Sequence, residues 1–386
     1  MRVGFVCGEY PPGPHGGIGT LVQLLARALV AAGHEVRVAG VYSRDYPAPD
    51  RETDRGVSVR RLRAHSGPFG SLRSRAALFR FFRRLTAAGE LDVVEAPDWE
   101  GWTAGWPRLD SPVVTRLSGS SSFFEWELGR SPRRLTFWIE RAALRRADFV
   151  CAESRYIADR TREVFGLSSS PDAIIYNPVD VPTDGAPVER IRDRVLFAGT
   201  LAEKKGIRSL VRAWPRVIGA RPGAELHVFG KPGTTAAGRS MQAELEDELR
   251  ASGAGGVVFR GHVPLADLLE ELKAARVVVL PSYAEGFSLM PLHAMACGCP
   301  TIYSRRGSGP EVIVDGVDGL LVDPESPEEI ASAILRVLTD DGLASRLGEA
   351  GALKVRRQFA LQSVLRENIL FYERCVAAFR RKRGVT

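Results

Sequence analysis

The chain has 386 residues, a formal charge of +7 at pH 7, 45% hydrophobic residues and 26% charged residues. This length predicts two domains, and the composition is typical of a globular chain rather than a disordered one. No stretch approaches the roughly 20 consecutive apolar residues that a membrane-spanning helix needs. The basic excess is spread over both halves of the sequence, which disfavours a nucleic-acid-binding stripe.

The five cysteines are scattered along the chain and odd in number, at positions 7, 151, 297, 299 and 375. This pattern disfavours a disulfide framework and a zinc ribbon, and it favours reduced thiols. The sequence enters a buried strand within three residues of Met1 and shows no apolar leader or cleavage site. We therefore expect no signal peptide and a cytoplasmic location.

Short apolar runs alternate with amphipathic helical segments through the first half of the chain. The predicted strands are 3–7, 34–39, 57–62, 93–95, 113–117, 149–152 and 173–176. The predicted helices are 19–32, 72–87, 132–146 and 154–165. Such alternation is typical of a parallel sheet covered by helices on both faces. A segment rich in Pro, Asp and Gly at 179–187 then predicts a linker.

The same alternation restarts after this linker. The predicted strands are 194–198, 225–229, 257–261, 276–280, 300–303 and 319–322. The predicted helices are 206–218, 238–251, 265–274, 288–297 and several from 326 onward. The sequence thus predicts two successive doubly wound α/β domains. Ligands of such sheets bind beyond the carboxyl ends of the strands, so a cleft between two facing domains is the expected site.

Two loops that follow predicted strands carry features suited to anions. Glycines at 16, 17 and 19 precede the first helix, where backbone N–H groups attract negative charge. A tight strand–helix turn would favour the same glycines. Lys204 and Lys205 follow the strand 194–198, where an ammonium group would contact phosphate oxygens. A solvated charged turn is the alternative interpretation.

The most informative segment is VVVLPSYAEGFSLMPLHAMACGCP, which spans 277–300. A buried strand ends there in a loop with Glu285 and Gly286, and a helix begins near Ser288. The amides of 287–289 would bind an anion, and Glu285 would accept hydrogen bonds from hydroxyls. His293 lies two helical turns after Glu285 and would reach the same ligand, although a lone helical histidine is more often structural. The sequence contains no Ser/His/Asp order, no HExxH motif and no DxD pair.

Taken together, these segments resemble the retaining GT-B glycosyltransferases of the GT4 family, which includes many bacterial mannosyl-, glucosyl- and N-acetylglucosaminyltransferases. The similarity extends over nearly the whole chain, and its specific blocks are the segment from 259 to 300 and GPEVIVDGVDGLLVDPESPEEIASAI at 309–334. The resemblance implies two Rossmann-like domains facing a central cleft. An acceptor-side domain would span 1–181, a nucleotide-sugar domain 188–358, and a C-terminal helix at 359–386 would cross back to the first domain.

The resemblance also implies the roles of individual residues. Glu285 would be the catalytic-site carboxylate that binds hydroxyls of the donor sugar, and Lys205 would pair with the diphosphate. The other residues expected to bind the donor are Gly16, Gly17, Thr200, Lys204, His262, Val263, Gly286, Phe287, Ser288, Leu289 and His293. Asp98, Trp99 and Ser118 are expected on the acceptor side. No metal and no other cofactor are expected, because Lys205 and helix amides would neutralise the phosphates.

The chain departs from the family's pattern at three positions. His293 stands where the family usually has a second Glu, and an imidazole cannot chelate two ribose hydroxyls as a carboxylate does. Thr200 stands where an Arg often binds phosphate. Ser118 stands where a His commonly lies near the anomeric carbon, and a serine is a poor base at neutral pH.

On this resemblance, the protein would be a retaining hexosyltransferase that uses a nucleotide diphosphate sugar, a UDP-sugar before a GDP-sugar. The acceptor would be a hydroxyl of a small natural product or of a lipid-linked or cell-envelope glycan. The alternatives are a catalytically weakened nucleotide-sugar-binding scaffold and a sugar-nucleotide epimerase of the same fold. Residues 58–88 include eight arginines and no acid. The segment 60–84 is therefore either a peripheral contact with the inner membrane face or a solvated helix face. The oligomeric state stays open.

Overall fold

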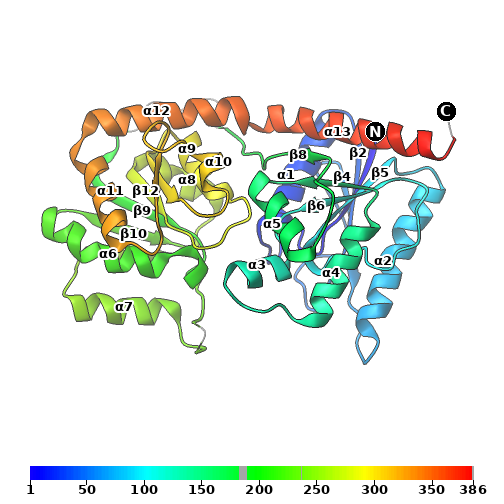
Figure 1. Cartoon of the computed structure of the whole chain (residues 1–386), viewed down its shortest axis with the longest axis horizontal. Coiled ribbons are helices and arrows are strands. Elements are labelled where there is room, and N and C mark those ends of the chain that lie inside the picture. Colours follow the sequence, from blue (N-terminus) through cyan, green and yellow to red (C-terminus); the bar gives the residue numbers. More distant parts are fainter. Residues whose placement is uncertain (182–188, 236, 385–386) are drawn as a thin grey trace. The chain divides into compact units, whose positions relative to one another are not determined.

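Each half of the alternating pattern builds its own sheet (Figure 1). The structure is a computed structural model that describes residues 1–181, 189–235 and 237–384. Unit 1 comprises Met1–Pro178 and Leu361–Thr386, and unit 2 comprises Val179–Ala360. The predicted pair of doubly wound α/β domains is confirmed. Most of the linker predicted at 179–187 lies outside the described residues.

Unit 1 contains an eight-stranded sheet in the order β3-β4-β2-β1-β5-β6-β7-β8. Its strands are β1 Arg2–Val6, β2 Glu35–Tyr42, β3 Arg51–Asp54, β4 Val57–Arg63, β5 Val93–Pro97, β6 Val113–Leu117, β7 Phe149–Ala152 and β8 Ala173–Ile174. Its helices are α1 Gly17–Ala31, α2 Gly70–Ala87, α3 Ser121–Glu127, α4 Arg134–Arg146, α5 Arg155–Phe165 and α13 Leu361–Lys382, with a 3₁₀ turn η1 at Trp99–Gly101. All pairings are parallel except that of β3 with β4.

Two hydrophobic clusters in unit 1 divide the side chains of its central strands between them. Val3 and Phe5 of β1 belong to a cluster that includes residues of α1 and α13. Val6, the next residue along β1, belongs instead to a cluster with Leu78 and Phe82 of α2. Successive side chains of a strand point to opposite faces of its sheet. The sheet of unit 1 is therefore buried on both faces, as its near-continuous apolar strands predict.

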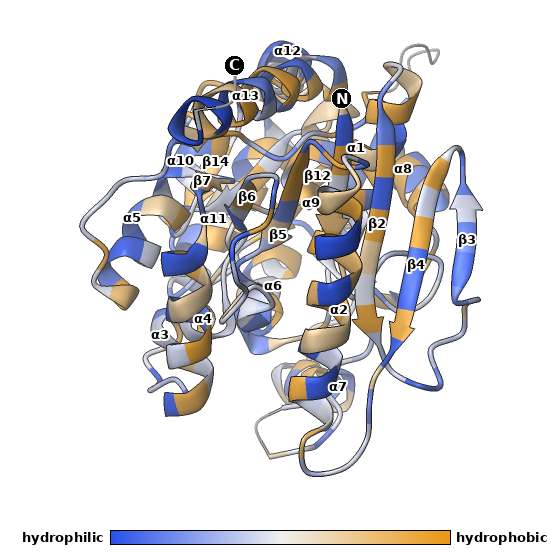
Figure 2. Ribbon diagram, turned by 90° about the vertical axis from the view of Figure 1, so that its right-hand side faces the viewer, coloured by the Kyte–Doolittle hydropathy of each residue, from blue (hydrophilic) through white to orange (hydrophobic). Residues whose placement is uncertain are grey.

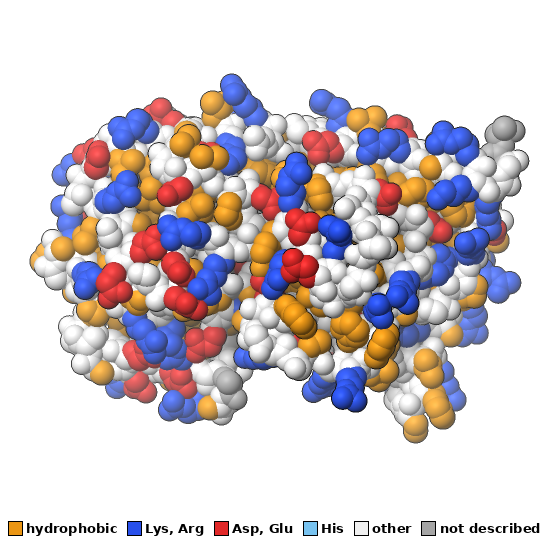
Figure 3. Space-filling view, in the orientation of Figure 1, with side chains coloured by type: hydrophobic (Ala, Val, Ile, Leu, Met, Phe, Trp, Pro, Cys, Tyr) orange, Lys and Arg blue, Asp and Glu red, His pale blue; other side chains and the backbone are white. Residues whose placement is uncertain are grey.

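Unit 2 contains a six-stranded, fully parallel sheet in the order β11-β10-β9-β12-β13-β14. Its strands are β9 Ile191–Ala198, β10 Glu225–Phe229, β11 Val257–Gly261, β12 Ala275–Leu280, β13 Thr301–Ser304 and β14 Leu320–Val322. Its helices are α6 Ile207–Ala220, α7 Met241–Ser252, α8 Leu265–Ala274, α9 Leu289–Ala296, α10 Gly309–Val312, α11 Pro327–Thr339 and α12 Asp341–Gln358, with a 3₁₀ turn η2 at Glu203–Lys205. On the face of unit 2 in Figure 3, side chains of both charges are interspersed.

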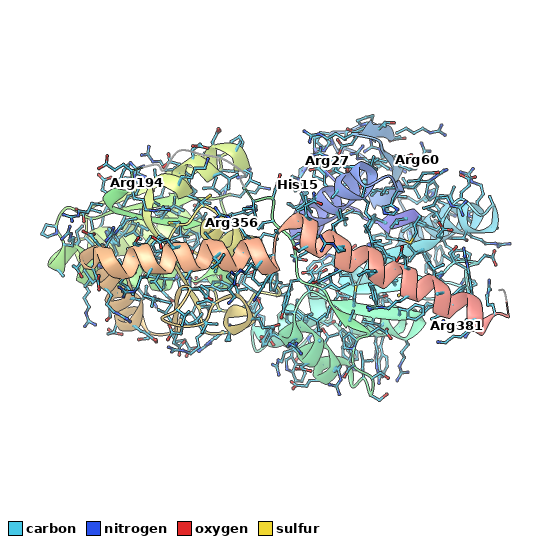
Figure 4. The ribbon with its side chains drawn as sticks, turned by 90° about the horizontal axis from the view of Figure 1, so that it is seen from above. His15, Arg27, Arg60, Arg194, Arg356 and Arg381 are labelled. Carbon is cyan, nitrogen blue, oxygen red and sulfur yellow. The ribbon has the colours of Figure 1, made fainter. Side chains whose placement is uncertain are left out.

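The C-terminal helix α13 is held on unit 1 by a buried polar network. Arg116 on β6 donates to both carboxylate oxygens of Glu95 on β5, at 2.8 and 2.9 Å. Arg116 also donates to Oδ1 of Asn368 on α13, and the Tyr372 hydroxyl donates to Glu95 at 2.7 Å. Asn368 and Tyr372 lie one helical turn apart, so both point to the sheet. Figure 4 shows α13 passing over unit 1 toward Arg381.

The structure differs from the sequence prediction at the short polar elements. Strand β3, with the sequence RETD, pairs antiparallel with β4 at the sheet edge, whereas a purely parallel sheet was predicted. It lacks the apolar residues that mark the other strands, because an edge strand buries little (Figure 2). Helix α3 was also missed. Among the described residues, no helix is long and apolar enough to cross a membrane.

We predict that Glu95→Leu destabilises unit 1 by about 3–5 kcal/mol, because Arg116 then stays buried without its carboxylate. Five of the six tryptophans lie in unit 1, so denaturant unfolding followed by tryptophan fluorescence measures this loss. Asp110→Asn is the matched control, since it removes only the exposed ion pair with Arg383. The control should change the free energy of unfolding by less than about 0.5 kcal/mol. Equal effects of the two substitutions would contradict the assigned role of the network.

Candidate active site

The strand order of unit 2 reverses at β9, which pairs with β10 on one side and with β12 on the other. Ligands of doubly wound sheets bind beyond the carboxyl ends of the strands at such a reversal. Lys205 lies in η2, shortly after β9, and Glu285 lies in the loop after β12. Two of the predicted donor-binding residues are thus brought together at the reversal.

The ammonium group of Lys205 forms an ion pair with Oε1 of Glu285. The hydroxyl of Ser282 donates to the same carboxylate oxygen at 3.0 Å. The Lys205 and Glu285 side chains keep 23% and 12% of their surface exposed, so incoming groups can reach both. An anionic oxygen can replace the carboxylate beside the ammonium, and hydroxyl groups can donate to the carboxylate.

Gly206 explains how η2 approaches the end of β12. It has φ +70°, and a Cβ built on it would lie 1.8 Å from the carbonyl oxygen of Pro281. A side chain at this position would push η2 away from β12. The carbonyl oxygen of Lys204 accepts from the backbone N–H of Tyr283 at 2.8 Å and ties the two loops together. Burial lowers the pKa of the Lys204 ammonium.

The remaining donor-site candidates of unit 2 follow neighbouring strands or begin a helix. Exposed Thr200 follows β9, and exposed His262 and half-buried Val263 follow β11. Gly286, Phe287, Ser288 and Leu289 connect the Glu285 loop to α9, whose N-cap residue Ser288 makes no side-chain capping hydrogen bond. The predicted cluster therefore lies at the carboxyl edge of the sheet in unit 2.

His293 is buried, with 7% of its surface exposed, whereas the titratable donor-site candidates Lys205 and Glu285 are partly exposed. Burial lowers the pKa of its imidazole to about 4, so the ring is neutral at pH 7. Among the described residues, its Nδ1 atom has no hydrogen-bond partner. A neutral imidazole offers one donor and one acceptor, in contrast to the two acceptor oxygens of a carboxylate.

Gly16 and Gly17 belong to unit 1, at the start of α1, near the labelled His15 in Figure 4. The carboxylate of Glu9 accepts from the backbone N–H groups of Gly16 and Gly19, at 3.1 and 2.7 Å. Glu9 thus supplies the negative charge that the N-terminus of a helix attracts. An anion that binds the amide of Gly16 would compete with this carboxylate.

The acceptor-side candidates occupy different environments in unit 1. Asp98, directly after β5, is completely buried, and its Oδ1 atom accepts from the Ser118 N–H at 3.0 Å. Burial raises the pKa of Asp98 to about 8. Asp98 therefore supports the Ser118 backbone instead of facing solvent. Trp99 begins η1 and is 38% exposed, with its ring beside Phe124. Ser118, after β6, is partly exposed.

Three polar residues of unit 1 were missed by the sequence analysis. Glu9 caps α1, Glu153 follows β7 and contacts Ser118, and Asn177 follows β8 and contacts Glu153. Glu153 and Asn177 stand at the ends of predicted strands, as Lys205 and Glu285 do. Their position after predicted strands could have identified them as site candidates, because neighbouring parallel strands end at one edge of a sheet.

Two family models match the chain over most of its length. The model described as "Glycosyl transferase 4-like domain" matches residues 16–178, and the model "Glycosyl transferases group 1" matches residues 192–340. The first match lies in unit 1 and the second in unit 2.

Similar solved structures share the fold at low sequence identity. Sucrose-phosphate synthase from Thermosynechococcus elongatus has a TM-score of 0.79 and 23% identity, with coverage of 98% of this chain and 100% of that chain. Anabaena HepE, in complex with UDP and glucose, has a TM-score of 0.75 and 17% identity, with coverage of 97% and 99%.

Relatives by sequence are glycosyltransferases as well. Glycogen synthase of Mycobacterium tuberculosis is 29% identical, over 94% of this chain and 92% of its own length. A D-inositol 3-phosphate glycosyltransferase of Thermobifida fusca is 28% identical, over 88% of this chain and 84% of its own. The family models, these relatives and the shared fold agree: the chain belongs to the GT4 family of GT-B glycosyltransferases.

Proposed function

We propose that this glycosyltransferase moves a sugar from a nucleotide diphosphate sugar to a hydroxyl acceptor with retention of configuration at the anomeric carbon. The observation that carries the proposal is the Lys205–Glu285 pair at the strand reversal of unit 2. The pair places a cation that can bind a diphosphate in direct contact with a carboxylate that can bind sugar hydroxyls. A UDP-sugar is favoured, because Anabaena HepE was solved with UDP and with UDP-glucose.

In the proposed reaction, the bond between the anomeric carbon and the diphosphate breaks through an oxocarbenium-like state. Lys205 and the N–H groups at the start of α9 stabilise the negative charge that develops on the diphosphate. Glu285 orients the sugar through its hydroxyls. The acceptor oxygen attacks the same face of the sugar, and its proton passes to the leaving phosphate. The acceptor is a small natural product or a lipid-linked glycan, bound at the carboxyl edge of unit 1.

The proposal assigns charge neutralisation to Lys205 and helix amides and needs no metal ion. Among the residues the structure describes, no group of three or more His, Cys, Asp or Glu side chains is arranged to hold one. With the charge neutralised by Lys205 and helix amides, activity should persist after treatment with a chelator. Loss of activity with EDTA, restored by a divalent cation, would contradict this part of the proposal.

Calorimetric titration with UDP, GDP, ADP and dTDP tests the donor site. We predict tight binding of one diphosphate, with UDP first and GDP next. Lys205→Ala should weaken that binding by about thirty-fold, since a charge-assisted hydrogen bond contributes about 2 kcal/mol. Lys273→Ala, which removes a partly exposed lysine paired with Glu270 on α8, should leave the affinity unchanged.

Product analysis separates transfer from the alternatives. Release of the diphosphate together with an α-linked product from an α-linked donor supports retaining transfer. Release of an isomerised sugar nucleotide would favour an epimerase, and tight binding without turnover would favour a scaffold.

His293 should stay neutral while the donor binds. In the folded protein the pKa of its imidazole lies near 4, below its usual 6.5. As the pH falls below 6.5, the imidazole takes up a proton in the unfolded protein but not in the folded one. The folded state therefore keeps its full stability above pH 6.5 and loses part of it as the pH falls from 6.5 toward 4. We predict that the free energy of unfolding falls over this range and falls less steeply for His293→Gln. NMR titration measures the same pKa from the imidazole resonance of His293, which is assigned by its absence from the spectrum of His293→Gln. A value near 6.5 would contradict the prediction.

The arginines of the segment 60–84 lie in two different environments. In β4, Arg61 is buried against Glu52, and Arg63 pairs with Asp50. On α2, by contrast, the outward face carries the exposed residues Arg73, Arg80, Arg83 and Arg84. Phe69 and Leu72, at the start of the helix, are 63% and 65% exposed. We therefore restrict the proposed peripheral membrane contact to the α2 face.

Vesicle sedimentation tests this contact. Vesicles with 30 mol% anionic lipid should bind the protein more than neutral vesicles do, and Arg80→Glu combined with Arg83→Glu should abolish the difference. Arg212→Glu combined with Arg250→Glu, at exposed positions of unit 2, is the matched control. Equal binding of both double variants would remove the α2 contact from the proposal.

A further inference from the structure

Four neighbouring parallel strands of unit 1 end in polar residues. Asp98 follows β5, Ser118 follows β6, Glu153 follows β7, and Asn177 comes shortly after β8. Glu153 and Asn177 are each only 4% exposed, whereas Ser118 is partly exposed. Ser118 also lines a small cavity with Pro97, Arg116 and residues of α1. The buried carboxylate of Glu153 therefore contacts a serine that is itself partly exposed and lines this cavity.

Ser118 is held from two sides. Its backbone N–H donates to Asp98 at 3.0 Å, and its hydroxyl donates to Oε1 of Glu153. The side-chain amide of Asn177 donates to the other oxygen of Glu153 at 2.8 Å, which fixes the carboxylate. A serine hydroxyl has one proton and two lone pairs. With its proton committed to Glu153, Ser118 can only accept a hydrogen bond on its exposed side.

We propose that Glu153 is a positioning residue that sets the hydrogen-bond polarity of Ser118 toward substrate. With Glu153 ionised, the Ser118 oxygen accepts a hydrogen bond from a hydroxyl of the acceptor. When Glu153 takes up a proton, its carboxyl group donates to Ser118, and the serine proton turns outward. A substrate hydroxyl must then rotate or lose this contact. The inference rests on the proposed transfer reaction. It adds that Glu153, acting through Ser118, orients a substrate hydroxyl in that reaction.

The surroundings of Glu153 place this change near neutral pH. Burial raises the pKa of Glu153 to about 7, while the hydrogen bonds from Ser118 and Asn177 and the charge of Arg116 oppose the rise. Glu95 raises the pKa slightly, but its carboxylate is committed to Arg116. Two other groups face Glu153, and both are neutral at pH 7: Asp98, with a pKa of about 8, and the thiol of Cys151, whose pKa burial raises.

The test compares kcat/KM against pH for the wild type, Glu153→Gln, Ser118→Ala and the double variant. In the wild type, kcat/KM should rise with pH through an inflection near 7. Glu153→Gln should lose this inflection and about ten- to a hundred-fold of kcat/KM at pH 8, because a glutamine amide donates where the carboxylate accepts. Ser118→Ala should lose a similar factor, and the double variant should be no worse than either single one.

Glu163→Gln is the matched control, since Glu163 is an exposed glutamate paired only with Arg160 among the contacts seen. It should keep both the rate and the inflection of the wild type. If Glu153→Gln keeps them as well, or if the losses of the single variants multiply in the double variant, the inference is overturned.

A second readout does not depend on turnover. The carboxyl ¹³C resonance of Glu153, assigned by its absence in Glu153→Gln, should titrate near pH 7 and shift to higher pH in Ser118→Ala, which removes a hydrogen bond to the ionised form. An unchanged titration in Ser118→Ala would overturn the inference even if Glu153→Gln fails to fold. If the wild type binds no nucleotide diphosphate and transfers no sugar, the proposed function fails, while this titration still reports on the pair.

Discussion

The chemistry of this protein depends on a constraint of parallel sheets: all strands of one sheet end at the same edge. In each unit the strand order also reverses beside the first strand, β1 in unit 1 and β9 in unit 2. The crossover connections diverge at that point and leave the strand ends uncovered. Residues far apart in the sequence, such as Lys205 and Glu285, meet there because their strands are neighbours. The functional residues of both units follow from this topology.

A second common feature is that carboxylates already occupy the groups that would bind an anion. Glu285 neutralises Lys205, and Glu9 accepts from the amides at the start of α1. Each contact keeps a cation or a helix N-terminus paired in the absence of ligand, which avoids the cost of an unsatisfied charge. On the proposed function, a phosphate that binds would have to displace each carboxylate. Net affinity for a donor is then the difference between two sets of contacts, which favours groups with more charge than a carboxylate.

Much of the fold could be predicted because its strands and helices carry strong apolar patterns. The strands β6, β7, β10 and β11 were predicted with their observed bounds. Strand β3 and helix α3 were not predicted, because the first is polar and the second is only seven residues long. Strand β3 is defined by its antiparallel pairing with the next strand, β4, and α3 by capping from its neighbour Ser120 and from Glu140, which lies 19 residues after Ser121. Neither contact carries an apolar pattern in the sequence.

The site residues show the same division. Lys205 and Glu285 stood out because each lies in a loop after a clear strand, and their contact confirms that these loops meet. Glu153 and Asn177 stood in equivalent positions but within segments that carry no glycine-rich loop or charge pair. Their importance arises from hydrogen bonds to Ser118 and to each other, over separations of 35 and 24 residues. Pairwise contacts of this kind are set by strand register, which a single sequence does not give.

The path of the chain has a consequence for how the protein is made. Unit 2 is inserted between two parts of unit 1, and the last part supplies Asn368 and Tyr372 to the Glu95–Arg116 pair. During synthesis, Glu95 and Arg116 emerge from the ribosome more than 250 residues before these partners. Unit 2, whose chain is continuous, can complete its core first. The first unit to begin synthesis is thus the last to finish folding, and the sheet face of nascent unit 1 that α1 and α13 share stays partly uncovered until α13 arrives.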